Sequence, residues 1–254
     1  FDGVVTVVSA DTNSFQLNLE ELKNKISNKT KAVIINSPNN PSGVIYSEET
    51  IKELSNILRE KELEFNKDIY LISDEPYREI VYDNIKVPCI LNYYNNSFIG
   101  YSYSKSLSLP GERIGYIVVN PKMNAFEDMT AALNIANRIL GFVNAPSLFQ
   151  RVIKESLKLE VDVNIYKKNR DLLYNHLVSI GFKCLKPDGA FYLFPKSPIE
   201  DDVKFCEDAK RFNILAVPGK TFGCPGYFRL SYCVSYDKIE KSLKSFDKLI
   251  KLYK

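Results

Sequence analysis

Residue types that often build metal and redox sites are scarce in this sequence. Among 254 residues there are one histidine, no tryptophan and two methionines. No two of the five cysteines form a CxxC pair; they are Cys89, Cys184, Cys206, Cys224 and Cys233. Zinc sites need clustered cysteine and histidine, so we expect no metal site. An odd cysteine count without a visible signal peptide indicates reduced thiols and predicts a cytoplasmic protein.

A long apolar run and a strong charge of either sign are also missing. No apolar stretch reaches the length that spans a bilayer, so we expect no membrane partner. The 34 basic and 31 acidic side chains leave a net charge of +3 and are mixed along the chain. Only this small positive charge supports nucleic acid as a partner, and we do not expect one. With 45% hydrophobic residues, the composition is typical of a globular protein with one large or two modest domains.

Strand-like and helix-like segments alternate through the first half of the chain. Apolar runs predict strands at 4–8, 31–36, 69–72, 98–103 and 114–119, and helical apolar spacing predicts a helix at 19–26. Ser47, followed by two glutamates, is typical of a helix N-cap, and Ile51, Leu54 and Leu58 form one apolar stripe on that helix. The alternation predicts an α/β domain with a mostly parallel sheet covered by helices on both faces. Because Phe1 opens inside the first predicted strand, we expect that the natural protein starts earlier.

The pattern changes near Pro146, where longer helical stretches begin. We predict helix in two pieces between 148 and 177, with Gly181 as a C-cap residue. Shorter strands are predicted at 190–194, 214–217 and 228–234, and a last helix begins near Asp237. The chain is therefore predicted to form a larger unit at 1–158 and a smaller α+β unit at 159–254.

Polar side chains lie at or just beyond the ends of the predicted strands. They are Asn40, Asp74, Ser102, Ser104 and Lys105. In open α/β sheets, ligands bind beyond the carboxyl ends of the strands. The sequence therefore predicts that these side chains share one site.

Four segments in a fixed order resemble the class I and II aminotransferases, which have the aspartate aminotransferase fold. They are NSPNNPSG at 36–43, DEPY at 74–77, SYSKSLSLPGERIG at 102–115 and FRLS at 228–231. The resemblance covers essentially the whole chain. It implies a fold-type-I α/β structure, with a smaller C-terminal α+β domain, that binds pyridoxal 5'-phosphate. It also implies a homodimer that moves an amino group from an amino acid to a 2-oxo acid.

Lys105 is the residue on which the resemblance depends most. A lysine amine attacks an aldehyde only when it is unprotonated, so it needs a partly desolvated, cation-rich pocket. A solvated surface lysine is the alternative for any single position. The place of Lys105 in Ser-Tyr-Ser-Lys-Ser after an apolar strand favours the first interpretation. By resemblance, Lys105 carries the cofactor as a Schiff base and moves the proton during catalysis.

Asp74, Tyr77 and Asn40 are the residues that, by resemblance, contact the cofactor ring. A carboxylate at a buried strand end needs a cation, and a protonated pyridine nitrogen would supply it. The alternative for Asp74 is a turn cap before Pro76, and the Asp-x-x-Tyr spacing favours the cofactor. Tyr77 and Asn40 match the family residues that contact the phenolic oxygen, although an Asx-turn also explains Asn40.

Arg113 and Arg229 match the two arginines that bind anions in this family. An arginine can form two parallel hydrogen bonds with a phosphate or a carboxylate. By resemblance, Arg113 binds the cofactor phosphate together with Ser102 and Ser104. Gly111 and Gly115 fit a tight approach around Arg113, although a plain turn explains them as well. Arg229 matches the arginine that binds the substrate α-carboxylate, and Asn40 lies with it on the substrate side. A cation–π contact is the alternative for Arg229.

Two further loops, 189–192 and 218–223, resemble loops that border the cleft, and we assign no role to their single residues. Family members carry a long N-terminal portion before the equivalent of Phe1. That portion supplies part of the site that binds the cofactor phosphate. We therefore expect weak cofactor affinity and little turnover from the 254 residues alone. Three alternatives remain: another fold-type-I enzyme (a β-lyase, decarboxylase or synthase), an inactive fragment, and a non-catalytic binding domain.

Overall fold

The N-terminal part of the chain is built around one mixed sheet of four strands. The computed structural model describes residues 3–159 and 161–253, so Phe1 lies outside the described residues. The strand order is β1-β2-β3-β4, with β1 at Ala32–Asn36, β2 at Tyr70–Asp74, β3 at Ser97–Ser102 and β4 at Gly115–Val119. The first three strands are parallel, and β4 pairs antiparallel with β3. The predicted α/β fold with a mostly parallel sheet is confirmed.

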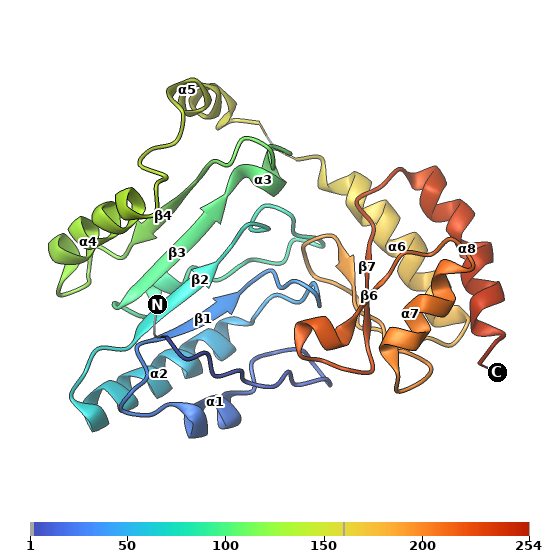
Figure 1. Ribbon diagram of the computed structural model, residues 1–254, viewed down its shortest axis with the longest axis horizontal. Coiled ribbons are helices and arrows are strands. Elements are labelled where there is room, and N and C mark those ends of the chain that lie inside the picture. Colours follow the sequence, from blue (N-terminus) through green and yellow to red (C-terminus); the bar gives the residue numbers. More distant parts are fainter. Residues whose placement is uncertain (1–2, 160, 254) are drawn as a thin grey trace.

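Helices α1 (Leu19–Lys25) and α2 (Glu48–Phe65) cover one face of this sheet (Figure 1). The Ser47 side chain accepts a hydrogen bond from the backbone N–H of Thr50, as predicted for an N-cap. The predicted apolar stripe of α2 is buried against strand residues of the same face; the stripe consists of Ile51, Leu54 and Leu58. This packing fixes the direction in which the strand ends point.

The opposite face of the sheet is only partly covered within the described chain. Ile34 of β1 is 71% exposed and Ile117 of β4 is 60% exposed. Helix α4 (Phe126–Ile139) contributes no buried residue, and α5 (Ser147–Ser156) contributes Ile153 alone. Cover by helices is therefore observed for one face, whereas we had predicted it for both. None of the helices in the described ranges is long and apolar enough to cross a membrane.

Two of the strand predictions for the N-terminal part are wrong in detail. Residues 4–8 form no strand, and Val4 and Val5 are 92% and 86% exposed, because β-branched residues form a strand only when another strand pairs with them. Strand β3 ends at Ser102, before the predicted Tyr103. The Ser102 hydroxyl accepts from the backbone N–H of Ser104 and starts the short helix α3 (Tyr103–Ser106), which carries Lys105.

The C-terminal part forms a second apolar core around a small antiparallel sheet. Its elements are α6 (Val163–Ser179), β5 (Tyr192–Leu193), α7 (Asp202–Lys210), β6 (Val217–Pro218), η2 (Gly219–Phe222), β7 (Phe228–Ser231) and α8 (Tyr236–Ile250), with the strand order β5-β7-β6. All three strands are shorter than predicted, because only two residues of β5 and two residues of β6 pair with β7. Tyr77, Ile80 and Tyr82, which follow β2 in the chain, are buried in this second core.

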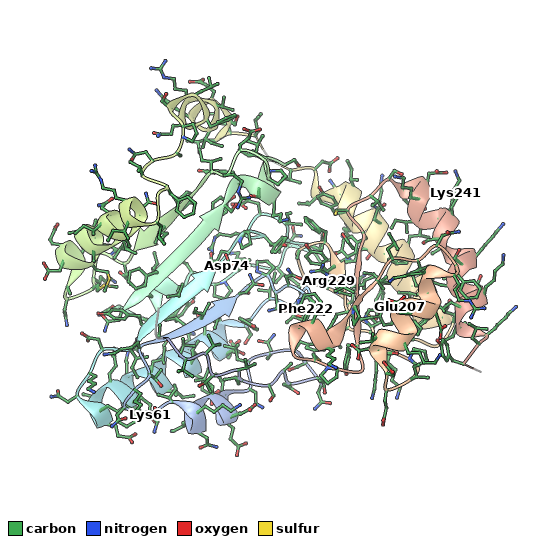
Figure 2. The ribbon with its side chains drawn as sticks, viewed as in Figure 1. Lys61, Asp74, Glu207, Phe222, Arg229 and Lys241 are labelled. Atoms are coloured by element: carbon green, nitrogen blue, oxygen red, sulfur yellow. The ribbon has the colours of Figure 1, made fainter. Side chains whose placement is uncertain are left out.

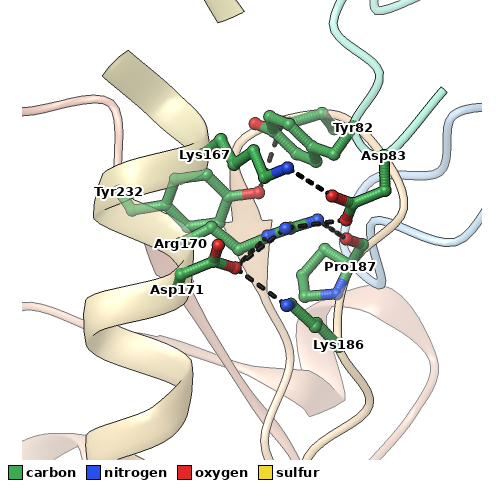
Figure 3. Close-up of polar contacts among 9 residues, drawn as sticks. Tyr82, Asp83, Lys167, Arg170, Asp171, Lys186, Pro187 and Tyr232 are labelled. Atoms are coloured by element: carbon green, nitrogen blue, oxygen red, sulfur yellow. Dashed lines mark hydrogen bonds and ion pairs between the residues drawn. The ribbon is translucent and has the colours of Figure 1, made fainter. Parts of the chain in front are cut away.

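Arg170 of α6 anchors the connection between the two parts (Figure 3). Its side chain is 1% exposed. It donates to a carboxylate oxygen of Asp83 at 2.9 Å and to the carbonyl oxygen of Pro187 at 2.9 Å. The guanidinium also lies 4.5 Å from the ring centre of Tyr82 and pairs with the adjacent Asp171. A single buried cation therefore holds α6, the segment after β2 and the 187–189 loop together.

Close backbone contact joins the 36–43 segment to the same loop. The N–H groups of Asp188 and Gly189 both donate to the carbonyl oxygen of Gly43 at 2.9 Å. Gly43 has φ +72°, and a Cβ there would lie 2.5 Å from Pro187 Cβ. Only glycine fits this conformation without displacing the neighbouring chain. The loop that carries Asn40 is thus held against the loop that leads to Tyr192.

Candidate functional site

Asp74 occupies the carboxyl end of β2, directly opposite Asn36 at the end of β1. The Asn36 amide donates to the Asp74 carbonyl oxygen at 2.8 Å and to its carboxylate at 3.4 Å. Asp74 keeps solvent contact, yet desolvation by the surrounding protein raises the pKa of its carboxyl above the ordinary value of 3.8. No lysine or arginine in the described ranges forms an ion pair with it, and no nearby cation offsets the desolvation.

Asn40 joins this strand end to the C-terminal part of the chain. Its backbone N–H donates to the Asn36 side-chain oxygen at 2.7 Å, and its own side-chain oxygen accepts from Arg229 Nη1 at 2.8 Å. Figure 2 shows Asp74 at the end of β2 that faces the C-terminal part, which carries Arg229 and Phe222. Asp74 and Arg229, which are 155 residues apart in the chain (229 − 74), are therefore linked through two asparagine side chains.

Arg229 lies close to two aromatic rings. Its guanidinium carbon is 4.5 Å from the ring centre of Tyr192 and 4.8 Å from that of Phe222. Because β5 pairs antiparallel with β7 and Tyr192 lies opposite Ser231, Arg229 is the diagonal neighbour of Tyr192 on the same face. The cation–π contact that we had considered as an alternative is present, and the hydrogen bond to Asn40 accompanies it.

Tyr77 and Lys105 complete this cluster. The hydroxyl oxygens of Tyr77 and Tyr192 are 3.0 Å apart. The Lys105 amine lies 5.8 Å from the ring centre of Tyr77 and 5.6 Å from that of Phe191. Burial raises the pKa of the Tyr77 hydroxyl above its ordinary value of 10.0, so this hydroxyl keeps its proton. Lys105 is half-buried, and the cluster remains open to solvent at Asp74.

Five of the eight predicted site residues are thus connected, either directly or through Asn36 and Tyr192. The connected residues are Asp74, Asn40, Arg229, Tyr77 and Lys105. The sequence predicted that Asp74, Asn40 and Lys105 share one site at the strand ends, and the structure connects them there with Arg229 of β7. We define the site cluster as these five residues together with Asn36, Tyr192 and Phe222.

The three predicted phosphate ligands lie outside the hydrogen-bond network of the site cluster in the structure. Ser102 and Ser104 bond to each other, with their hydroxyl oxygens 2.7 Å apart. Arg113 is exposed, has φ +51° and donates through Nη1 to the Pro110 carbonyl oxygen at 2.9 Å. Ser102 and Lys105 are tied by the short helix α3, whereas no direct contact joins the Arg113 side chain to the site cluster within the described residues.

The two glycines beside Arg113 differ in their packing. A Cβ at Gly115 would lie 2.3 Å from the Tyr101 carbonyl oxygen, which is a tight approach of two strands, as we predicted. A Cβ at Gly111 would meet no atom within 4 Å. Gly111 therefore fits the alternative that we left open, a plain turn.

Three members of the site cluster received no role from the sequence. Asn36 precedes a proline-rich turn, and its register opposite Asp74 is visible only once β1 and β2 pair. Tyr192 and Phe222 belong to the two loops that resembled cleft loops. Their signal in the sequence was the presence of aromatic residues in two glycine-containing loops, two in 189–192 and one in 218–223, which did not distinguish packing from a site.

Comparisons with known proteins identify relatives along the whole described chain. The sequence profile of the family described as Aminotransferase class I and II matches residues 2–246. A probable aspartate aminotransferase of Methanocaldococcus jannaschii is 36% identical, over 95% of this chain and 64% of its own length. An aminotransferase structure from Eubacterium rectale is 52% identical, with a TM-score of 0.94, over 97% of this chain and 62% of the other. The aspartate aminotransferase structure of Thermotoga maritima is 32% identical, with a TM-score of 0.85, over 98% of this chain and 64% of the other. The chain thus spans less than two thirds of the length of these relatives.

Proposed function

The chain belongs to the class I and II aminotransferase family, and from that membership we propose that the protein moves an amino group from an amino acid to a 2-oxo acid. Enzymes of this family use pyridoxal phosphate. The single observation that carries the proposal is the contact network that brings Lys105, Asp74 and Arg229 to one edge of the sheet. These residues supply the amine, the carboxylate and the guanidinium that such a reaction needs.

The chemistry of the site cluster fits this cofactor. Asp74 is a partly desolvated carboxylate without a cationic partner among the described residues, and a pyridinium nitrogen would complete the pair. The Tyr77 hydroxyl and the Asn40 amide offer hydrogen-bond donors for a phenolic oxygen. Lys105 offers the amine that binds an aldehyde covalently. When bound, the cofactor supplies an electron sink for the bond broken at the substrate α-carbon.

Each predicted site residue then has a defined task. Lys105 Nζ removes the proton from the substrate α-carbon and returns a proton to the product. Arg229 binds the substrate α-carboxylate through two parallel hydrogen bonds. Asn40 orients Arg229, because its side-chain oxygen accepts a hydrogen bond from Arg229 Nη1. We assign Arg113, Ser102 and Ser104 to the cofactor phosphate, supported by their family match and by the link of Ser102 and Ser104 to α3.

The wider context of the proposal concerns substrate, assembly and location. The named relatives of Methanocaldococcus jannaschii and Thermotoga maritima are aspartate aminotransferases, so aspartate is the first amino donor to test. Exposed apolar side chains around the end of α4, including Ile135, Ile139 and Phe142, support a homodimer. The five free thiols support a cytoplasmic location. The two main apolar cores support a division into 1–158 and 159–254, with Tyr77, Ile80 and Tyr82 of the first part packed in the second core.

Borohydride trapping tests the assignment of the amine. The full-length protein is mixed with pyridoxal phosphate, reduced with borohydride and digested for mass mapping. Label on Lys105 is expected, and Lys105→Ala is expected to remove it, whereas Lys122→Ala, which alters a lysine outside the site cluster, should retain it. Label on any other lysine as the main product would overturn the assignment.

Amino transfer separates the proposal from other reactions that share the fold. Aspartate is supplied with 2-oxoglutarate, and oxaloacetate and glutamate are measured together. Equal amounts of the two products are expected. Ammonia and a 2-oxo acid released without glutamate would indicate a lyase, and carbon dioxide released without glutamate would indicate a decarboxylase. Labelled protein without any turnover would favour the non-catalytic alternative.

A further inference from the structure

We propose that Tyr192 is a positioning residue for two members of the site cluster, Arg229 and Tyr77. Its ring and the ring of Phe222 hold Arg229 in place, and its hydroxyl donates to Tyr77 so that the Tyr77 proton points toward the cofactor. The proposal rests on the proposed function and adds to it a residue that acts through two others. Tyr192 is 7% exposed and belongs to the loop held by Arg170 and Gly43.

The ring of Tyr192 restrains Arg229 without occupying its donors. A guanidinium carries five N–H groups in one plane, and aromatic rings contact its faces. With Tyr192 at 4.5 Å and Phe222 at 4.8 Å, two rings restrict tilting of that plane. Asn40 accepts one hydrogen bond, from Nη1, and the remaining in-plane donors stay available to a carboxylate. The two rings and one amide therefore orient the guanidinium before any substrate is bound.

The hydroxyl of Tyr192 sets the direction of the Tyr77 hydrogen bond. Each phenol has one proton and can also accept, so the 3.0 Å contact allows either direction. The positive charge of Arg229 over the Tyr192 ring withdraws electron density and makes that hydroxyl the better donor. If Tyr192 donates, the proton of Tyr77 is left free for an acceptor on the cofactor. The raised pKa of Tyr77, caused mainly by burial, keeps that proton in place at neutral pH.

A purely structural role for Tyr192 makes a different prediction. Its ring also packs against Tyr77 and Phe191, with ring centres 5.8 Å and 4.9 Å apart. If packing were its whole contribution, Tyr192→Phe would behave as the unsubstituted protein, because the ring is retained. The hydroxyl and the ring can therefore be tested separately.

The first measurement follows the hydroxyl. The full-length protein is loaded with pyridoxal phosphate, and the absorbance of the lysine-bound cofactor is titrated with pH. Donors to the phenolic oxygen lower the proton affinity of the cofactor imine, and a Tyr77 hydroxyl that accepts from Tyr192 is a stronger donor. Because this cooperativity is about 10–30% of a hydrogen bond, Tyr192→Phe is expected to raise the pH midpoint by about 0.1–0.7 unit. The control is Tyr166→Phe, which removes a hydroxyl from a ring that also packs against Phe191. An equal midpoint in Tyr192→Phe and the control would overturn the role of the hydroxyl.

The second measurement follows the ring. The dissociation constant of succinate, a dicarboxylate without an amino group, is measured on the loaded protein. Tyr192→Phe should leave it within about twofold, whereas Tyr192→Leu and Phe222→Leu should each raise it about 5–30-fold, the loss of one desolvated cation–π contact. Phe222→Leu should also leave the pH midpoint unchanged, and it provides the test if Tyr192→Leu fails to fold. Unchanged succinate binding in the folded leucine variants would overturn the role of the ring.

The outcomes also distinguish this proposal from the proposed function. If the unsubstituted protein shows no borohydride label on Lys105, both fall together. If Lys105 is labelled, but Tyr192→Phe leaves the midpoint and the folded leucine variants leave succinate binding unchanged, only the role of Tyr192 is lost.

Discussion

Arg229 donates a hydrogen bond to the side-chain oxygen of Asn40 at 2.8 Å, across 189 residues of chain. This contact joins a turn that follows β1 to the middle of β7, and it is a direct polar link between the N-terminal and C-terminal members of the site cluster. Neither residue is a member of an apolar core. The orientation of the Arg229 guanidinium therefore depends on how the two parts of the chain are held together.

Removal of this link should weaken carboxylate binding. In Asn40→Ala, Arg229 loses its acceptor and keeps only the rings of Tyr192 and Phe222. We expect the dissociation constant of succinate to rise about 10–100-fold, because a hydrogen bond to a charged group contributes about 1.5–3 kcal/mol. Asn134→Ala is the control, since Asn134 lies on α4 and donates only to a backbone carbonyl of its own helix. Equal binding by the two variants would show that Asn40 does not orient Arg229.

Asp74 should be unfavourable for the stability of the ligand-free fold. Desolvation raises the pKa of the Asp74 carboxyl in the folded state. At a pH between the unfolded-state and folded-state pKa values, the folded protein therefore binds more protons than the unfolded protein. Stability therefore falls as pH rises through that window, and the loss remains at neutral pH. Asp74→Asn should raise the thermal midpoint of ligand-free protein near pH 7 and leave it unchanged at about pH 3.

The same substitution should have the opposite effect on cofactor binding. The asparagine side chain in Asp74→Asn is neutral and cannot pair with a pyridinium nitrogen, so pyridoxal phosphate is expected to bind about 10–100-fold more weakly. Absorbance titration at neutral pH measures this change. Tighter or equal cofactor binding, together with higher stability, would remove Asp74 from the site.

Local sequence signals predicted the elements that a few residues determine. The N-cap at Ser47 and the stripe of Ile51, Leu54 and Leu58 depend on contacts within one helix and its immediate neighbours. Polar residues at the ends of apolar runs likewise predicted that Asp74 and Lys105 lie at one edge of the sheet. These features needed only periodicity and the general behaviour of parallel sheets.

Features that depend on pairing between distant segments were not predictable in this way. The β-branched run at 4–8 has the composition of a strand but no paired strand in the described chain. The roles of Asn36 and Tyr192 depend on register: Asn36 lies opposite Asp74, and Tyr192 lies diagonal to Arg229. Register is set by the partner strand, which no local pattern specifies.

Asp83 should contribute an acid-sensitive part of the stability. Hydrogen bonds from Lys167 and Arg170 lower its pKa from 3.8 to about 2. Because the folded-state value lies below the unfolded one, the stabilisation is present above pH 3.8 and is lost as pH falls toward about 2. Asp83→Asn should therefore be less stable than the unsubstituted protein at neutral pH, with a difference that shrinks in this window. Asp237→Asn, which breaks an exposed pair with Lys241, should change stability little at any pH.

Gly189 should tolerate no side chain, although the open turn at Gly111 should. A Cβ at Gly189 would lie 2.8 Å from both the Ile80 carbonyl oxygen and Pro38 Cβ, where backbone on one side cannot yield. Gly189→Ala is expected to lower the free energy of unfolding by about 1–3 kcal/mol. Gly111→Ala meets no atom within 4 Å and should change it by less than about 0.5 kcal/mol. Denaturant titration of both variants makes the comparison, and equal effects would contradict the packing of this loop.

Arg170 should contribute more to stability than any exposed ion pair near it. Arg170→Met would remove the buried donor that Asp83, Asp171 and the Pro187 carbonyl oxygen share, although both carboxylates are partly exposed and keep a second cation. Loss of these charged hydrogen bonds is expected to cost about 1.5–3 kcal/mol. Lys167→Met removes the exposed cation that shares Asp83 and should cost no more than about 1 kcal/mol. If denaturant unfolding shows equal losses for the two variants, then Arg170 does not anchor the 187–189 loop, and the fixed position of Tyr192 beside Arg229 would need another explanation.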